Sequence, residues 1–470
     1  MVLVAQNEHE TYSVVLIGRD GTEVLVVPDS GGFALPSVEI PRWQRAAENI
    51  TGAVKAKWGE EVVCLFELNN LPGTRDSGIH YQVAEHWRTV GVPTIPTKWL
   101  PVAGLSKDSL IGADDNLAIQ RSRAQCSEGG KTSPVGPFAA LGWFKEVRTW
   151  VEEVVEPLGF HVNGNFRQLN ASPTFSLIRF ETDGPALWFK AVGEPNQREF
   201  PITCALSRLF PCYVPGVVAT RPNWNGWLMR EAVGPLLSDV QEVALWEKSA
   251  AALAQLQIDS IGHGSQILAA GARDVGVTVL SRIVEPFVET MTRLMQRQTK
   301  TPPERLDRAQ LHVLGDRIQI ALDALDTLGI PETLGHLDLN PGNIVVSPVR
   351  CVSLDWAEAY VGNPFLTFQY LLEHFRRTHR KDSSQESQIV ESYAAPWRRI
   401  LSHEAINACL AMAPLLAVFS YMCGTGMLSD GERLKQAEFV GYLRGLARRM
   451  DREARAWVDR SRKCTTQAVI

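Results

Sequence analysis

A short stretch in the C-terminal half of the chain constrains the fold most: GHLDLNPGNIVVSPVRCVSLDW, residues 335–356. Its Pro-Gly pair disfavours a helix, so Asp338 and Asn343 are predicted to lie on a loop before a short strand, residues 344–346. The run CVSLDW pairs naturally with that strand and leaves Asp355 at its end. A hairpin of this kind would bring two carboxylates and a carboxamide together.

Two carboxylates and a carboxamide at this spacing suit phosphate chemistry. Mg²⁺ prefers oxygen ligands and is commonly held by one or two protein oxygens beside phosphate and water. The carboxylate that does not bind the metal can accept the proton of an attacking hydroxyl. The loop with Asp338 and Asn343, taken alone, is also ordinary turn chemistry, and Asp355 alone could simply cap the next segment. Only the two together indicate a phosphate site.

The pattern HLDLNPGN…LDW resembles the HGDLHPGN…IDW signature of the aminoglycoside phosphotransferase and choline kinase family, small-molecule relatives of the protein kinases. The resemblance covers about residues 160–380. It implies a bilobal kinase-like fold with ATP and Mg²⁺ as cofactors. By the same resemblance Asp338 is the catalytic base, Asn343 and Asp355 are the metal ligands, and His336 supports the loop.

The chain departs from the family pattern at several positions. Leu337 stands where the family usually has Gly, and Asn340 stands where it often has His. Residues 361–365 resemble the family's GhPxxDL stretch, but Leu366-Thr367-Phe368 lacks its Asp. None of these changes removes a reacting group, although Leu337 is expected to alter the geometry of the loop.

A kinase of this kind also needs a strand lysine paired with a helix glutamate. Lys190 lies in the strand-like run ALWFKAV, and Glu199 follows at the start of a helix-like segment, REFPITCALSRLF. Alone, such a lysine is usually solvated and such a glutamate usually interacts with the helix dipole. Their order and spacing after a predicted hairpin indicate the kinase pair.

Two further segments complete the nucleotide site that the resemblance implies. The run WLMREAVG is predicted to be the strand and hinge that bind adenine through the main chain, with Met229 and Glu231 as candidates. The loop over the phosphates is expected within residues 169–177, which contain no glycine. Its candidate ligands are the hydroxyls of Ser172, Thr174 and Ser176.

The order of strand-like and helix-like segments along the chain predicts an α+β protein in which a strand-rich lobe precedes a helical lobe. A further small α/β domain is expected ahead of them. The predicted boundaries are an N-terminal domain at 1–125, a Gly/Ser/Pro-rich linker at 126–137, the strand-rich lobe with a leading helix at 138–235, the helical lobe at 236–462 and a flexible tail at 463–470.

The N-terminal region resembles the Nudix fold, with a strand hairpin, an LP-x-x segment and a helix ending in Gly59. The Nudix box carries three catalytic glutamates, and its alignment on Gly59 places them at Ala53, Ala56 and Lys57. A lysine repels the metal ion that a glutamate would hold. The resemblance therefore implies a non-catalytic domain that binds, senses or dimerises.

Bulk properties narrow the remaining classes. A net charge of -5 gives no support for a nucleic-acid or membrane-surface binder, and eight scattered cysteines fit reduced thiols in a cytosol. The first residues show no secretory pattern, so a cytoplasmic location is expected. Residues 405–429 are uncharged and long enough to cross a bilayer, but we interpret them as a buried helix or helix pair because Pro414 and Gly424 interrupt them.

The sequence therefore predicts an ATP- and Mg²⁺-dependent kinase that phosphorylates a hydroxyl of a small molecule. The basic segment HFRRTHRKD mildly disfavours a polycationic acceptor, and the sequence does not identify which other small molecule is the acceptor. The alternative is a catalytically silent nucleotide-binding regulator or scaffold on the same fold. A protein kinase is disfavoured because the chain has no DFG or APE motif.

Overall fold

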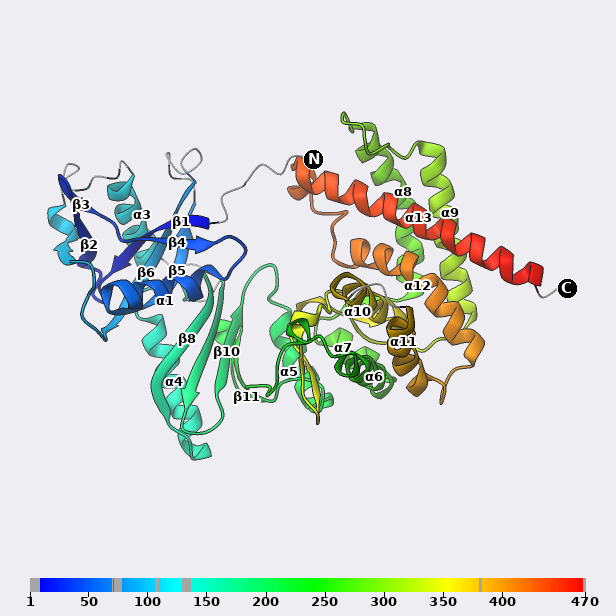
Figure 1. The fold of residues 1–470 in the computed structure, drawn as a ribbon, viewed down its shortest axis with the longest axis horizontal. Coiled ribbons are helices and arrows are strands. Elements are labelled where there is room, and N and C mark those ends of the chain that lie inside the picture. The colour runs from blue at the N-terminus through cyan, green and yellow to red at the C-terminus, as the bar shows by residue number, and fades with distance from the viewer. Residues whose placement is uncertain are drawn as a thin grey trace. The chain divides into compact units, whose positions relative to one another are not determined.

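The computed structural model describes residues 9–69, 71, 78–105, 110, 112, 114–128, 137–379 and 383–467. The chain divides into two compact units, residues 1–200 with 216–231 and residues 201–215 with 232–470. The first unit holds two β-sheets and the second is mainly helical (Figure 1). The predicted α+β class with a strand-rich part and a helical part is therefore confirmed.

A seven-stranded mixed sheet opens the first unit. Its main path is β3-β2-β1-β6-β5, with β4 paired to β1, β7 paired to β2, and β1 parallel to β6. The β1–β2 hairpin predicted at Asp20-Gly21 is confirmed, and Gly21 has the positive φ of 73° that its turn requires. The strands are β1 (His9–Ile17), β2 (Glu23–Asp29), β3 (Gly32–Ala34), β4 (Ser37–Pro41), β5 (Glu60–Leu68), β6 (Ile79–Thr89) and β7 (Lys98–Pro101).

Helices α1 (Ala46–Trp58) and α3 (Asp115–Glu128) pack on this sheet. Val14 and Leu16 of β1 share a core with α1, whereas Val15 and Ile17 share a core with α3, as expected for a strand buried on both faces. The helix predicted to end at Gly59 is α1, which begins at Ala46, after β4 has ended at Pro41. The first residues assigned to the linker, 126–128, instead close α3, because Cys126 is buried in the core; residues 129–136 lie outside the described residues.

A five-stranded antiparallel sheet follows, in the order β11-β12-β10-β9-β8. Its strands are β8 (Val162–Ser172), β9 (Phe175–Thr182), β10 (Leu187–Val192), β11 (Val217–Arg221) and β12 (Gly226–Arg230). The predicted leading helix is α4 (Trp143–Val155), whose Phe144, Val147 and Val151 pack in one core with Ile178 and Phe189 of the sheet. The hairpin predicted at residues 182–185 joins β9 to β10.

The two sheets of the first unit are joined by a buried amide. The Gln168 side chain of β8 accepts a hydrogen bond from Cys64 N (2.7 Å) and donates one to Cys64 O (2.8 Å) on β5. The core around α4 also contains Val15 and Val63 of the first sheet. The regions predicted as a separate N-terminal domain and a strand-rich lobe thus share one hydrophobic core.

The described residues of the second unit form eight helices and five short strands, with α5 (Glu199–Leu209) leading into it. Strands β13, β17 and β14 form one sheet, and β15 pairs with β16 in a hairpin. The helices are α6 (Val243–Asp259), α7 (Gly264–Ala269), α8 (Val277–Gln296), α9 (Arg308–Thr327), α10 (Pro364–Thr378), α11 (Ser383–Trp397), α12 (His403–Gly424) and α13 (Ala437–Gln467). The strands are β13 (Arg273–Val275), β14 (Thr333–His336), β15 (Ile344–Val346), β16 (Cys351–Ser353) and β17 (Ala359–Gly362).

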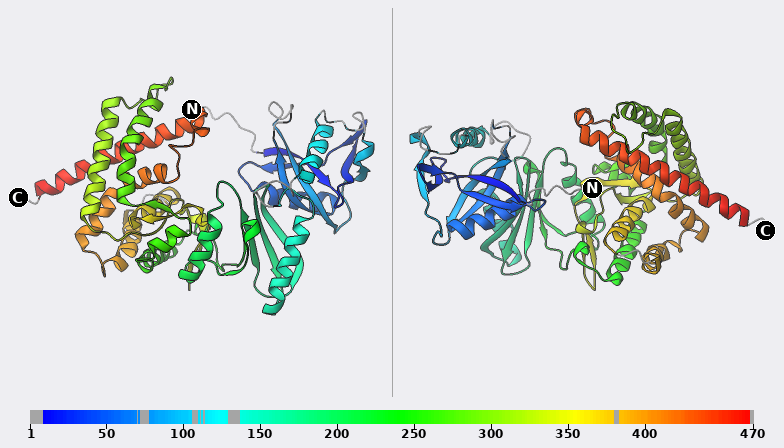
Figure 2. Two further views of the ribbon diagram at one scale, coloured as in Figure 1. Left: turned by 180° about the vertical axis from the view of Figure 1, so that it is seen from behind. Right: turned by 45° about the horizontal axis from the view of Figure 1, so that its top comes forward.

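The long helix α13 packs along α8, α9 and α12, as Figure 2 shows. Its range includes residues 463–467, which were predicted to belong to a flexible tail. The last three residues lie outside the described residues. Short 3-10 helices complete the structure at residues 102–104, 156–158, 222–224, 237–239, 341–343, 356–358 and 433–435.

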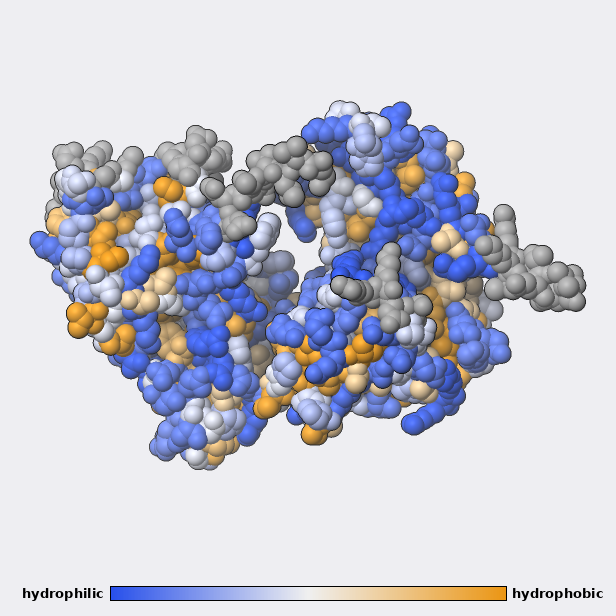
Figure 3. All heavy atoms as spheres, in the orientation of Figure 1, coloured by the Kyte–Doolittle hydropathy of each residue, from blue (hydrophilic) through white to orange (hydrophobic). Residues whose placement is uncertain are grey.

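Helix α12 accounts for the uncharged segment. It is the one helix of the described chain that is long and apolar enough to cross a membrane, and 56% of its most apolar window is buried. Its Met412, Leu416 and Phe419 belong to the main core of the helical unit. The visible face of this unit is largely hydrophilic, with apolar atoms in separate areas (Figure 3).

Glu85 of β6 gives the first unit a pH-dependent stability. Both carboxylate oxygens lie 3.0 Å from Gly142 N, and burial raises the pKa of Glu85 to about 7. The folded state therefore binds this proton more tightly than the unfolded state, so the stabilisation present at low pH is lost as pH rises through 7.

We predict that Glu85→Gln, which cannot ionise, gains stability relative to the wild type by on the order of 2 kcal/mol between pH 5 and pH 8. Urea unfolding at the two pH values measures the difference. The exposed Glu23→Gln on β2 is the control and should follow the wild type. Parallel pH dependences for Glu85→Gln and the wild type would contradict the prediction.

Candidate active site

Lys190 and Glu199 form a buried ion pair in the first unit. Lys190 Nζ lies 2.5 Å from Glu199 Oε1, and the two side chains are 9% and 3% exposed. Lys190 sits in the centre of the sheet on β10, directly across from Leu177 of β9 and Trp227 of β12. The pairing predicted from the sequence is therefore present, and the glutamate fixes the direction in which the ammonium group points.

The strand register divides the candidate residues between the two faces of this sheet. Residues directly opposite each other on paired strands project to the same face. Lys190 thus shares a face with Leu177, whereas Ser176 pairs with Ala191 and projects to the face that packs on α4. Ser176 is fully buried, and its hydroxyl has no hydrogen-bond partner among the described residues.

The predicted phosphate loop is the tight turn between β8 and β9. Pro173 and Thr174 form the turn, and Ser172 Oγ accepts a hydrogen bond from Thr174 N (3.2 Å). A Cβ added to Gly193 would come within 2.9 Å of Thr174 Cβ. Gly193, just after β10, therefore allows the turn to approach the end of that strand closely, although the turn itself contains no glycine.

The hinge candidates have different environments. Met229 is half-buried on β12 opposite Trp188. Glu231 donates its main-chain N–H to Ala186 O (3.0 Å), and its carboxylate accepts bonds from Arg179 Nε (2.6 Å) and Trp188 Nε1 (3.1 Å). The hydrogen bond from Arg179 lowers the pKa of Glu231, so this carboxylate is charged and held on the sheet.

In the second unit, His336 connects the two halves of the sequence motif. Its Nδ1 accepts a hydrogen bond from Asp338 N (3.0 Å), so the proton of a neutral ring is on Nε2, which donates to Asp355 O (2.8 Å). Burial lowers the pKa of His336 and keeps the ring neutral. The imidazole thereby fixes the main chain beside both aspartates, the support that the resemblance implied.

The hairpin predicted from the sequence brings Asn343 to the Asp355 segment. The paired strands β15 and β16 match Ile344 with Ser353, and Leu354 N donates to Asn343 O (2.8 Å). Asn343 Nδ2 donates to Asp338 O (3.1 Å), which leaves the amide oxygen as the remaining acceptor of that side chain. The side chain of Asn340 caps the turn by accepting from Gly342 N (2.9 Å).

Asp355 has a strained backbone. Its φ of 61° and ψ of 59° are in the left-handed region, which non-glycine residues seldom adopt and which is common at functional sites. The residue is exposed and precedes the 3-10 turn of residues 356–358. His336 holds this conformation through the Asp355 carbonyl, so the carboxylate is presented outward.

Asn343 and Asp355 fit the donor set of a magnesium site. One carboxylate and one amide oxygen are hard ligands, and Mg²⁺ usually keeps further positions for phosphate and water. No group of three His, Cys, Asp or Glu side chains that could hold a metal occurs in the described part of the chain. The fit is therefore to a hydrated ion bound with a phosphate, and not to an all-protein cage.

Leu337 is accommodated in the helical core. Its side chain is 5% exposed. A Cβ added to Gly424 would lie only 2.8 Å from Leu337 Cδ1. Leu337 N donates to Glu358 O (2.9 Å), as part of the connection to β17. Gly424 at the end of α12 thus provides the space that a leucine at this position of the loop needs.

Sequence reasoning missed the role of α10. Thr367 Oγ1, in the segment that lacks the family Asp, accepts a hydrogen bond from His336 N (2.9 Å) and bonds to the Tyr360 hydroxyl (2.9 Å). One turn later, the Tyr370 hydroxyl donates to Asp338 Oδ1 (2.8 Å). The helical spacing of Thr367 and Tyr370 was a usable signal, because positions three apart lie on one helix face.

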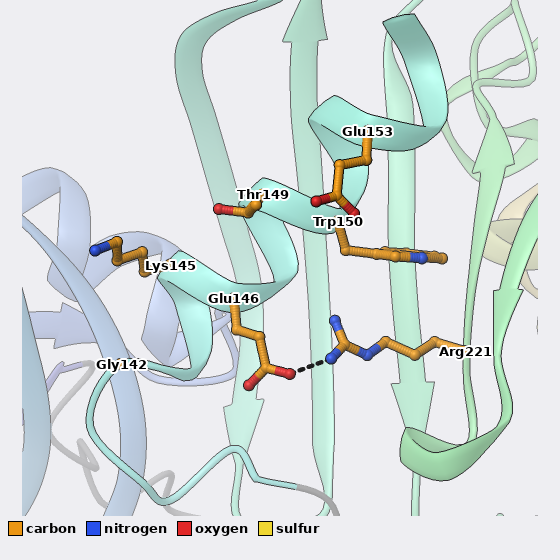
Figure 4. Close-up of a pocket in the computed structure, with 7 residues that line it drawn as sticks. All are labelled: Gly142, Lys145, Glu146, Thr149, Trp150, Glu153 and Arg221. Atoms are coloured by element: carbon orange, nitrogen blue, oxygen red, sulfur yellow. Dashed lines mark hydrogen bonds and ion pairs between the residues drawn. The ribbon is translucent and has the colours of Figure 1, made fainter. Parts of the chain in front are cut away.

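The first unit also contains a pocket of about 560 Å³ along α4 (Figure 4), and no predicted site residue lines it. Glu146 points toward Arg221 and is ion-paired with it, while the Arg221 guanidinium lies 3.5 Å from the centre of the Trp224 ring. The remaining lining residues are Gly142, Lys145, Thr149, Trp150 and Glu153. Apart from the pair of Glu146 with Arg221, its lining shows no arrangement that indicates a particular ligand.

No protein-family model matches the chain, and no curated protein matches its sequence. Solved structures do resemble it. The macrolide 2′-phosphotransferase from Brachybacterium faecium is 17% identical, with a TM-score of 0.40 over 64% of this chain and 98% of its own. The choline kinase from Streptococcus pneumoniae is 15% identical, with a TM-score of 0.42 over 67% of this chain and 99% of its own. The Plasmodium vivax ethanolamine kinase is 13% identical, with a TM-score of 0.41 over 65% of this chain and 88% of its own. These low identities and scores carry no functional conclusion, which has to come from the residues of the site.

We predict that Leu337 and Gly424 are energetically coupled. Leu337→Ala should cost about 2–4 kcal/mol because it empties a buried space. Gly424→Ala forces Leu337 to shift in the wild-type background but partly fills the vacated space in the Leu337→Ala background. The double variant should therefore be more stable than the sum of the single changes by about 1 kcal/mol.

Urea unfolding of the four proteins measures this coupling. Gly441→Ala on α13 is the matched control, because an added Cβ there meets nothing within 4 Å. Its effect should add to that of Leu337→Ala without coupling. Additivity of the Leu337 and Gly424 changes would show that the loop is not held by this contact.

Proposed function

We propose that the chain is an ATP- and Mg²⁺-dependent phosphotransferase whose acceptor is a hydroxyl group of a small molecule. The observation that carries the proposal is the arrangement around His336, which fixes Asp338 on a rigid loop and holds Asp355 in a strained conformation. Strained residues and buried polar networks of this kind are typical of sites that need fixed geometry.

In the proposed reaction the acceptor oxygen attacks the γ-phosphorus of ATP. The bond from that phosphorus to the β–γ bridging oxygen breaks, ADP leaves with the electron pair, and the acceptor proton passes to Asp338. Lys190 would bind the nucleotide phosphates and Glu199 would orient it, as their buried pairing suggests. Met229 and Glu231 at the end of β12 remain the proposed main-chain contacts of the adenine, and Thr174 in the β8–β9 turn the proposed contact of the phosphates. The register removes Ser176 from the face of Lys190, so its hydroxyl is a poor phosphate ligand.

Asn343 and Asp355 are the residues that would hold Mg²⁺. When bound, the ion supplies positive charge that stabilises the phosphate oxygens. Asn343 Oδ1 is available for this role because the Nδ2 group of the same amide is directed at Asp338 O. The strained backbone at Asp355 orients the second ligand.

We predict that Asp338→Asn lowers the rate of ADP release from Mg·ATP with an accepted hydroxyl compound at least 100-fold, on the order of a lost general base. A library of hydroxylated metabolites, assayed for ADP, identifies the acceptor. Asp326→Asn on the exposed surface of α9 is the control and should keep wild-type turnover. Binding of Mg·ATP should survive both changes.

Two outcomes would contradict the proposal. Undiminished turnover in Asp338→Asn would exclude this carboxylate as the base. Binding of Mg·ATP without turnover of any acceptor would favour the silent regulator that the sequence left open.

We further predict that Asp355→Asn weakens metal binding more than catalysis at saturating metal. Loss of one of two charged or polar ligands should shift the Mg²⁺ concentration for half-maximal activity upward by roughly tenfold or more. Binding of Mn²⁺ in the presence of ADP, followed by electron paramagnetic resonance, gives a readout that is independent of turnover. Asp338→Asn should leave the Mn²⁺ signal unchanged, and an equal loss in both variants would refute the division of roles.

A further inference from the structure

The hydrogen bond between Tyr370 and Asp338 is not explained by the proposed function. The phenol donates to Asp338 Oδ1 over 2.8 Å, the kind of bond that the acceptor hydroxyl has to make with the same carboxylate. The Tyr370 hydroxyl is therefore an internal mimic of the acceptor. A carboxylate that is already satisfied by a phenol is less able to activate water.

The position of Tyr370 is fixed by the loop that it contacts. Thr367, three residues earlier on α10, bonds to His336 N, and the Asn363 side chain caps the start of the helix by accepting from Phe365 N (3.0 Å). The same loop therefore holds the base and the helix that carries the phenol. A substrate hydroxyl that bonds to Asp338 Oδ1 has to displace the Tyr370 hydroxyl from it.

The surroundings of Tyr370 keep its hydroxyl a donor and allow the ring to pack. Burial and the nearby charge of Asp338 raise the pKa of Tyr370, so the phenol keeps its proton. The ring stacks with Tyr421 at 6.4 Å between centroids and makes an edge contact with His374 at 4.9 Å. Tyr370 itself is only half-buried, so the hydroxyl can be displaced without opening the core.

We propose that Tyr370 is a specificity-determining residue that occupies the acceptor position on Asp338 until a hydroxyl substrate displaces it. The inference rests on the proposed phosphotransfer function. Its consequence is that water, which has to compete with the phenol and gains no contacts of its own, is a poor acceptor. ATP is thereby protected from hydrolysis while no substrate is bound.

The test is acceptor-free hydrolysis of Mg·ATP by Tyr370→Phe. In this reaction water attacks the γ-phosphorus, the bond to the β–γ bridging oxygen breaks, ADP leaves with the electron pair, and a water proton passes to Asp338. Because the variant keeps the ring and loses only the hydroxyl, ADP release should rise roughly tenfold, as expected for one lost hydrogen bond to a charged group. The thermal unfolding midpoint should stay near that of the wild type.

Two further variants separate this role from a structural one. Tyr421→Phe removes the phenol hydroxyl of the ring that stacks on Tyr370, and should leave acceptor-free hydrolysis unchanged. The double variant Tyr370→Phe/Asp338→Asn should return to the rate of Asp338→Asn alone. A merely structural effect of Tyr370 would not depend on the carboxylate in this way.

The results distinguish the inference from the function on which it rests. If the wild type phosphorylates an acceptor but Tyr370→Phe hydrolyses ATP no faster than the wild type, Tyr370 is not an acceptor mimic and the phosphotransfer proposal stands. A slower reaction in Tyr370→Phe has the same meaning and assigns the phenol to positioning the base. If no protein releases ADP above the level of Asp338→Asn, with or without acceptors, both proposals fail.

Discussion

The candidate site depends on one buried, neutral imidazole. His336 accepts from Asp338 N and donates to Asp355 O, so a single planar ring sets the distance between two segments of main chain. The ring can do this only while it carries one proton, because a second proton on Nδ1 would face the N–H of Asp338. Burial keeps the ring in that state. The strained conformation of Asp355 follows from this bond, and with it the outward direction of the proposed metal ligand.

The buried pair of Lys190 and Glu199 has a different energetic character. Removing two opposite charges from water costs several kcal/mol, and their attraction does little more than offset that cost. Such a pair adds little to the stability of the fold, but it fixes the direction of the Lys190 ammonium group. The proposed function needs that orientation, because Lys190, in the centre of the sheet beside Trp227, would have to face the nucleotide phosphates.

The sequence predicted what depends on local pattern. The short strands of the 344–353 hairpin, the Lys190 strand and the Glu199 helix all followed from alternation, turn residues and spacing. The sequence failed where a side chain meets a distant one. The face of Ser176 depends on the exact strand register, since a shift of one residue exchanges the two faces. The contact of Leu337 with Gly424 and the bond from Tyr370 to Asp338 join segments whose relative placement no local pattern specifies.

The shared core of the first unit gives its N-terminal sheet a physical role in supporting the second sheet. Gln168 fixes β8 to the main chain of Cys64, and Ala171 near the end of β8 packs against the core beneath α1. Three residues later Thr174 makes the turn that lies against Gly193. The turn proposed to contact phosphate thus lies at the end of a strand that pairs with β9 and also packs against β5 of the N-terminal sheet and against α1. Because packed cores transmit displacement instead of absorbing it, a change in that sheet would reach the turn through β8.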